Sequence, residues 1–351
     1  MNLVSSRVQV SDRYEELNEY FRSRRWTDGL PIVPPTEERV AAMLSAVDLD
    51  PAVSLGKIAP SWEEAVLEKV AVNAVMAGCA PAFMPVVVAA IQAMCDPKFN
   101  LYSVQATTHP VAPLVIVNGP IARRLGMNSG SGVFGPGYHA NATIGRAIRL
   151  VLLNIGGGWP GEGDMATQGQ PSKYSYCIAE NEAANPWEPL HVERGFARND
   201  SVVTVFGGES PHNVNDHVST TAAGVLGVIA DTLTSLGGNT KWYFAESECA
   251  VVLGPEHAAT IHRDGLTKAD VRRMLYETAR RSLRDLKRGG MWQMHDWPRW
   301  MQAIADDEAR LPIIPGPEAI LLLVAGGPGK HSAVIPNMAV GLAVSRQVAA
   351  S

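Results

Sequence analysis

Short apolar segments of β type alternate with helical segments after about residue 100, and this alternation constrains the fold more than any other feature. The segments of β type are 114–117, 174–178, 202–206, 250–253 and 319–324. The helical segments between and after them are 142–154, 218–236, 256–263 and 268–287. Such alternation is typical of an α/β or α+β fold in which helices flank a mixed sheet.

The first hundred residues follow a different pattern. The segments 12–25, 61–77 and 82–95 have the residue pattern of helices, and Ser61 with Glu64 matches a capping box. The sequence therefore predicts an N-terminal helical region over 1–100 and an α/β domain over 101–351. The same pattern is compatible with one continuous domain in which the first region forms a helical layer.

Glycine is concentrated between one strand and the helix that follows it. Five glycines fall within the twelve residues 126–137, and we expect the next helix to start at Asn141. Glycine is retained where the backbone turns sharply or approaches a ligand closely. A strand, a glycine-rich loop and a helix N-terminus together predict a site for a small anionic ligand. The residues that would bind this ligand are Asn128, Ser129, Asn141 and Arg146.

Four strand-end segments carry polar side chains on loops rich in glycine and proline. They are 117–120, 206–217, 253–257 and 324–332. If the strands are parallel neighbours, these loops meet at one edge of a sheet, where α/β proteins bind ligands. The alternative is that glycine and proline simply end each strand.

Histidine and carboxylate side chains on these loops are the candidates for acid–base catalysis. We predict His109, His139, His212, Glu180 and Glu209 as catalytic residues. Glu180 and Glu182 would share one face if their strand continues, although they could equally form a solvated edge. His139 precedes the expected helix start, where the helix dipole favours an anion and lowers the pKa of a histidine.

The cofactor is not determined by these residues, although a divalent metal is compatible with them. The metal-ligand candidates are His109, His212, His217 and Glu180. The spacing of His212 and His217 is not the HExxH of zinc proteases.

Lys173, Lys330 and His331 complete the predicted substrate-binding residues. Lys330 and His331 lie on the glycine-rich segment GGPGKHS (326–332). This segment resembles a phosphate-binding P-loop, but Val324 replaces the first glycine and His331 replaces the Ser or Thr after the lysine. We therefore reject an NTPase and keep Lys330 and His331 as ligand contacts.

Composition excludes several classes of partner. The net charge is −5 without long basic runs, which argues against nucleic acid as a partner. No apolar run reaches the ~18 residues that span a membrane, and the N-terminus lacks the apolar core of a signal peptide. Four cysteines are widely spaced without a CxxC motif, which predicts a cytoplasmic protein without disulfides.

Several strings resemble a bacterial protein family associated with UGSC-motif (seleno)proteins. They are WTDGLPIVPPTEERV (26–40), QATTHPVAPLVIVNGP (105–120), VFGPGYHANATIGRA (133–147), DMATQGQPSKYSYCIAENE (164–182), VVLGPEHA (251–258) and AGGPGKHS (325–332). The resemblance covers about residues 20 to 335. UGSC proteins look similar to the selenocysteine subunits of glycine-reductase-type enzymes. Because this chain lacks a UGSC or CGSC motif, the resemblance implies that any redox thiol comes from a UGSC-type protein partner.

The leading hypothesis is a cytoplasmic enzyme that cleaves, hydrates or reduces a carbon–heteroatom bond of a small anionic organic substrate. Its class would be lyase, hydrolase or oxidoreductase, and we expect a homo- or hetero-oligomer. One alternative is a subunit of a thiol or selenol redox complex. The other is a ligand-binding or scaffolding subunit without chemistry.

Overall fold

Two four-stranded sheets form the centre of the protein. The computed structural model describes residues 3–235, 237–238, 248–288, 297–337 and 341–349. The first sheet has the order β12–β5–β3–β4, with β3 Ala112–Asn118, β4 Cys177–Ala179, β5 Val202–Gly208 and β12 Val344–Gln347. The second has the order β10–β7–β11–β6, with β6 His212–Asn215, β7 Cys249–Leu253, β10 Ile320–Val324 and β11 His331–Pro336.

Both sheets are mixed. The pairs β3/β4 and β10/β7 are parallel, and the other neighbours are antiparallel. This confirms the prediction of an α/β or α+β fold with mixed strands and flanking helices. The strands divide between two sheets, which the alternation along the chain did not reveal.

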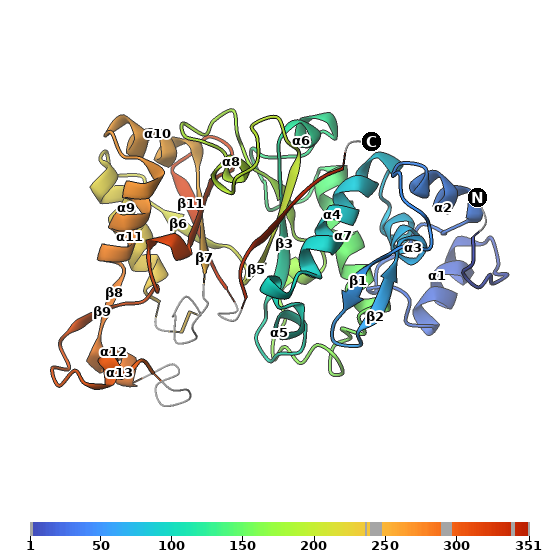
Figure 1. Cartoon of the computed structure of the whole chain (residues 1–351), viewed down its shortest axis with the longest axis horizontal. Coiled ribbons are helices and arrows are strands. Elements are labelled where there is room, and N and C mark those ends of the chain that lie inside the picture. Colours follow the sequence, from blue (N-terminus) through green and yellow to red (C-terminus); the bar gives the residue numbers. More distant parts are fainter. Residues whose placement is uncertain (1–2, 236, 239–247, 289–296, 338–340, 350–351) are drawn as a thin grey trace.

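The protein has four layers, because the side chains of each central strand alternate between an inner face and an outer face. Leu114 of β3 and Val252 of β7 belong to one apolar cluster between the sheets. The next residues along these strands, Val115 and Val251, belong to clusters on the two outer faces, where helices cover the sheets. Successive residues of a strand point to opposite faces, so strands that are apolar throughout must be covered on both sides. Figure 1 shows the resulting order of helices, sheet, sheet and helices.

Two groups of helices form the outer layers. The first sheet is covered by α4 Met84–Met94 and α7 His139–Asn154. Outside them lie α3 Leu67–Ala77, α2 Glu37–Leu44, α1 Tyr14–Ser23 and the hairpin β1 Ser54–Ile58/β2 Glu63–Val66. The second is covered by α9 Ala222–Leu233, α10 Pro255–Arg263 and α11 Lys268–Thr278. Shorter elements are α5 Leu101–Gln105, α6 Pro120–Arg124, α8 Leu190–Glu193, α12 Leu283–Arg288, α13 Arg299–Gln302, β8 Arg280–Ser282 and β9 Arg310–Pro312.

The first hundred residues share their apolar core with the first sheet. Leu67 and Val87 lie in the same cluster as Val115 and Val203. The N-terminal region is thus an outer layer on this sheet. It is not purely helical, because it also contains the β1–β2 hairpin.

Several predicted helix boundaries are wrong. The capping box at Ser61 does not form, because Glu63–Val66 pairs as β2 and α3 starts at Leu67. The predicted helix 268–287 ends at Thr278, and β8 follows because it pairs with β9. The helix predicted from residue 218 starts at Ala222, because Asp216 accepts hydrogen bonds from the backbone of a preceding turn.

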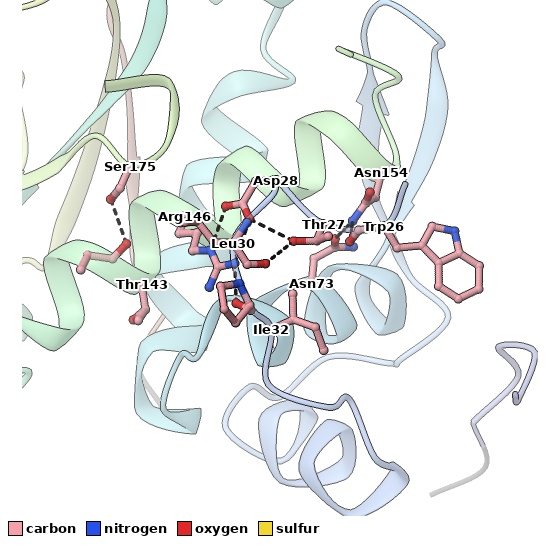
Figure 2. Close-up of polar contacts among 12 residues, drawn as sticks. Trp26, Thr27, Asp28, Leu30, Ile32, Asn73, Thr143, Arg146, Asn154 and Ser175 are labelled. Carbon is pink, nitrogen blue, oxygen red and sulfur yellow. Dashed lines mark hydrogen bonds and ion pairs between the residues drawn. The ribbon is translucent and has the colours of Figure 1, made fainter. Parts of the chain in front are cut away.

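A buried ion pair joins the N-terminal segment to α7 (Figure 2). Arg146 donates to both carboxylate oxygens of Asp28 at 2.8 Å and to the carbonyl of Pro31. The Asp28 side chain is 3% exposed and that of Arg146 15%. About two turns beyond Arg146 on the same helix, Asn154 donates to the carbonyl of Trp26. Together these contacts hold segment 26–32 against the helix.

Candidate functional site

A cavity of about 390 Å³ lies between two glycine-rich loops. One wall is 131–135 and the other is 325–329, and the floor includes Val252 and Ala333 of the second sheet. A Cβ atom on Gly327 would lie 1.9 Å from the Ser131 hydroxyl, so only glycine lets the walls meet here. The Gly326 N–H donates to the carbonyl of Ser129 at 2.9 Å and joins the loops. The loop predicted from its glycines is therefore one wall of a cavity.

Three of the four strand-end loops contribute to this cavity, through Asn213, Gly254 and residues 325–329 and 331–332. The reason is strand direction. The parallel neighbours β7 and β10 end at the same edge of the second sheet, and the antiparallel strand β11 begins there. The fourth loop, 117–120, follows β3 in the other sheet and does not line the cavity.

Two imidazoles meet at the edge of the cavity. His331 Nε2 lies 3.1 Å from His217 Nε2, and His331 Nδ1 lies 3.1 Å from Asn213 Oδ1. An amide oxygen only accepts, so Nδ1 of His331 carries hydrogen and its Nε2, in the neutral ring, accepts from His217. Lys330 donates to the carbonyl of His217 at 3.3 Å. The arrangement is a hydrogen-bonded chain, Asn213–His331–His217. Because Nε2 of the neutral His217 ring donates to His331, the Nδ1 atom of His217 is the proton acceptor at the end of the chain.

Ser332 and His257 have the spacing of a nucleophile and its base. Ser332 borders the cavity, but its hydroxyl bonds to His257, which is buried and does not line the cavity. Ser332 Oγ lies 2.8 Å from His257 Nδ1 and accepts from the Gly254 N–H, and His257 Nε2 lies 3.1 Å from the Asp216 carbonyl oxygen. His331 and Ser332 are successive residues of β11, so their side chains point to opposite faces of the sheet. Val334 has the same orientation as Ser332, and it packs in the outer helical cluster. The pair is buried under α10 and holds that helix to the sheet.

His109 and Glu209 form the one His–carboxylate ion pair of the described residues. His109 Nε2 lies 2.7 Å from Glu209 Oε1, and His109 Nδ1 is buried without a partner. They meet because β3 and β5 are antiparallel and pair Ala112 with Gly208, which brings residues 100 positions apart together. Tyr176 donates to the Glu209 carbonyl at 2.9 Å, and burial raises the pKa of Tyr176 well above its ordinary value.

The Tyr176 ring also connects this pair to the cavity. It lies 6.2 Å, between ring centroids, from Phe134, which lines the cavity. His109 and Glu209 themselves do not line it. The predicted catalytic residues His109 and Glu209 therefore form a second group, which the rings of Tyr176 and Phe134 separate from the cavity.

The predicted site of His109, His139 and His212 does not assemble. His139 Nε2 lies 2.7 Å from the carbonyl of Gly78, and its ring packs against Phe83 in the outer helical layer. His212 is exposed on the edge strand β6. The described contacts join none of these three histidines to another, because each lies on a different layer or edge of the fold.

Glu180 is a structural carboxylate. It is buried and accepts hydrogen bonds from Asn118, Asn185 and the Leu190 backbone. Burial raises the pKa of Glu180, although Lys268, the Leu190 N–H and the Asn118 amide oppose that shift. Glu182 contacts the same Asn118 amide, as expected for a shared face. These bonds join β3, β4 and α8.

Four predicted anion-binding residues make hydrogen bonds or ion pairs to other parts of the protein. Asn141 is buried inside α7, which starts at His139, and its amide pairs with the backbone N–H and carbonyl of Asn128 at 2.8 and 3.0 Å. The Asn128 side chain bonds to Gly130 and Ser131, and the Ser129 carbonyl holds the opposite loop. Arg146 is paired with Asp28. The sequence pattern located the loop correctly but assigned its polar groups to a ligand.

The remaining candidates divide between two places. Lys173 is paired with Asp164 beneath the loop that precedes β4. Lys330 and His331 lie at the edge of the cavity. Among the residues that the structure describes, His, Cys, Asp and Glu side chains form no group of three or more that could hold a metal ion. The metal candidates His109, His212, His217 and Glu180 therefore do not form a common site.

All four cysteines are free thiols whose ionisation is suppressed. Burial raises the pKa of Cys79 to about 12, that of Cys95 to about 11 and that of Cys249 to about 12. Burial also raises the pKa of Cys177. We expect the native protein at neutral pH to react with iodoacetamide at least about a hundredfold more slowly than the unfolded chain, because the thiolate is the reactive form.

Thiol labelling followed by mass spectrometry of the four cysteine peptides measures this rate. A cysteine that reacts as fast in the native protein as in urea would contradict the expectation. A slow rate at all four would mean that none of these thiols acts as a nucleophile in the folded protein at neutral pH.

Comparisons with protein-family models, curated proteins and solved structures find no match. Within the described ranges, no single helix is long and apolar enough to cross a membrane. One pair of helices, 81–94 and 97–105, reaches that length and composition only with a bend of 70° between them.

Proposed function

We propose that this protein is an enzyme that binds a small organic substrate in the glycine-lined cavity and transfers a proton through His331 and His217. The observation that carries the proposal is the imidazole chain at the cavity edge, with the Nε2 atoms of His331 and His217 3.1 Å apart. A concave site with a few convergent polar groups is the usual form of a small-molecule site.

The surroundings of the two imidazoles suit proton transfer. Asn213 orients the ring of His331 and fixes its tautomer. A proton accepted by His217 can be shared with His331 across their hydrogen bond, which stabilises the charged form of the pair. The ammonium group of Lys330 lies beside this pair and favours an anionic substrate. Imidazole proton transfer is the step common to elimination, hydration and hydrolysis at carbon–heteroatom bonds.

Replacing His331 with alanine should lower turnover about 10²–10⁴-fold, the usual contribution of a general acid or base. The measurement is conversion of a panel of small hydroxy, amino and thio acids by the purified protein, followed by mass spectrometry. Ala333→Leu should abolish conversion by filling the cavity floor. His262→Ala is the matched control, because it makes the same change at an exposed position of α10 that does not line the cavity.

A substrate that is converted equally by the wild type and by His331→Ala would refute the assignment. The same panel tests a second candidate centre, the pair of His109 and Glu209. The specific observation in its favour is the buried Nδ1 atom of His109, which has no partner within the described residues. If His109→Ala and Glu209→Gln abolish conversion while His331→Ala does not, the reaction belongs to that pair.

A further inference from the structure

Arg149 of α7 is a buried cation without a partner. Its side chain belongs to a residue only 6% exposed, and its Nε atom is buried and unbonded. Within the described residues its guanidinium makes no hydrogen bond or ion pair. Burial lowers the pKa of Arg149 to about 10, which leaves it charged at neutral pH. An isolated buried charge costs several kcal/mol, so a guanidinium in this position calls for an anion.

The nearby carboxylates are already engaged. Asp164 binds Lys173 through one oxygen and the Ala166 N–H through the other, at 3.0 Å. Asp28 uses both oxygens for Arg146. Both carboxylates act on Arg149 only at longer range. We call Arg146, Arg149, Lys173, Asp28 and Asp164 the Arg149 cluster; it holds three cations and two carboxylates and has a net charge of plus one.

A second unpartnered donor lies beside Gly158, just beyond the C-terminal end of α7. Gln105 is 1% exposed, and its Nε2 atom has no acceptor. A Cβ atom on Gly158 would lie 2.3 Å from this nitrogen, so only glycine lets the backbone approach the amide this closely. The Gly158 N–H donates to the carbonyl of Leu152, three residues after Arg149 on the helix. Arg149 and Gln105 therefore supply two buried donor groups without acceptors, one on the C-terminal half of α7 and one just beyond its end.

We propose that the Arg149 cluster and Gln105 form a binding site for a small monocarboxylate. A single negative charge neutralises the net charge of the cluster, whereas a phosphate dianion would overcompensate it. The two oxygens of a carboxylate match the planar donor fork of a guanidinium, which a spherical chloride ion does not. The site is separate from the glycine-lined cavity, and the inference does not depend on the proposed reaction.

The test is the thermal unfolding midpoint in sodium formate, sodium acetate or sodium chloride at equal ionic strength. The wild-type midpoint should rise with formate or acetate beyond its value in chloride. A carboxylate at about 100 times its Kd shifts the folding equilibrium about a hundredfold. Arg149→Met should lose this response, and its midpoint in chloride should equal or exceed that of the wild type, because an apolar side chain of similar length removes the unpaired charge.

Arg124→Met is the matched control, since Arg124 is exposed on α6 and should leave the carboxylate response unchanged. Gln105→Leu keeps the charge of the cluster and should weaken the carboxylate response several-fold. If Arg149→Met does not fold, the response of Gln105→Leu tests the proposal in its place. A wild type that responds equally to all three salts would overturn the proposal. So would an undiminished carboxylate response in Arg149→Met or, where that variant does not fold, in Gln105→Leu.

Discussion

Replacing Asp28 with alanine should lower the free energy of unfolding by about 3–5 kcal/mol, the usual cost of leaving one member of a buried ion pair alone. Arg146 would lose two hydrogen bonds of 2.8 Å and remain close to Arg149, a second buried cation. The loss should be largest for the N-terminal layer, because Asp28 ties segment 26–32 to α7 (Figure 2).

Urea denaturation of the wild type and Asp28→Ala measures this effect. Glu19→Ala, which breaks the exposed pair with Arg22, is the matched control and should cost less than about 1 kcal/mol. The double variant Asp28→Leu/Arg146→Met should recover most of the loss, since it leaves no unpaired charge of this pair. A loss below about 1 kcal/mol in Asp28→Ala would show that solvent reaches Arg146.

Replacing Glu180 with glutamine should cost about 1–3 kcal/mol for each buried donor that loses its acceptor. One carboxylate oxygen of Glu180 accepts from Asn185, and the other accepts from Asn118 and the Leu190 N–H. An amide nitrogen in either position faces donors, so no rotation of the glutamine side chain satisfies all three. The contacts join β3, β4 and α8, and their loss should loosen the end of the first sheet.

The cost should also depend on pH. Because burial raises the pKa of Glu180, the folded protein binds this proton more readily than the unfolded chain. The stability contributed by this group is therefore fully present below its ordinary value of 4.5 and falls as pH rises through the raised value. The difference in unfolding free energy between the wild type and Glu180→Gln should be larger just below 4.5 than at neutral pH.

Unfolding free energies of both proteins at the two pH values check this sign, and the difference cancels the titration of other groups. Glu188→Gln, at an exposed position in the same segment, should show little change at either pH. A difference that grows towards neutral pH would mean that the donors outweigh burial and hold Glu180 ionised.

Local features of the chain were predictable because their causes are local. The strands β3, β5, β7 and β10 were predicted from continuous apolar runs, and each is buried on both faces. The capping box of Thr267 and Asp270 forms from a local motif, because both residues lie within one helical turn. The glycine loop 126–137 was also recognised, since glycine at this density is unfavourable unless the backbone needs it.

The partners of polar side chains were not predictable from the sequence. Arg146 and Arg149 lie on the same helix with the same side chain, yet Asp28 reaches only the first. His139 and His331 both follow glycine-rich segments, but one packs against Phe83 and the other lines the cavity. The difference depends on which segments the sheets bring together, 61 to 118 residues apart in these contacts.

The sequence by itself determined the central strands β3, β5, β7 and β10, where the glycine-rich loops lie and that these strands are covered on both faces. These properties depend on side-chain periodicity and backbone freedom within a few residues. Only the tertiary structure decided that the strands form two sheets, that His217 meets His331 and that Arg149 remains unpaired. Strand order and direction set these contacts, and they are established by long-range packing that no local pattern encodes.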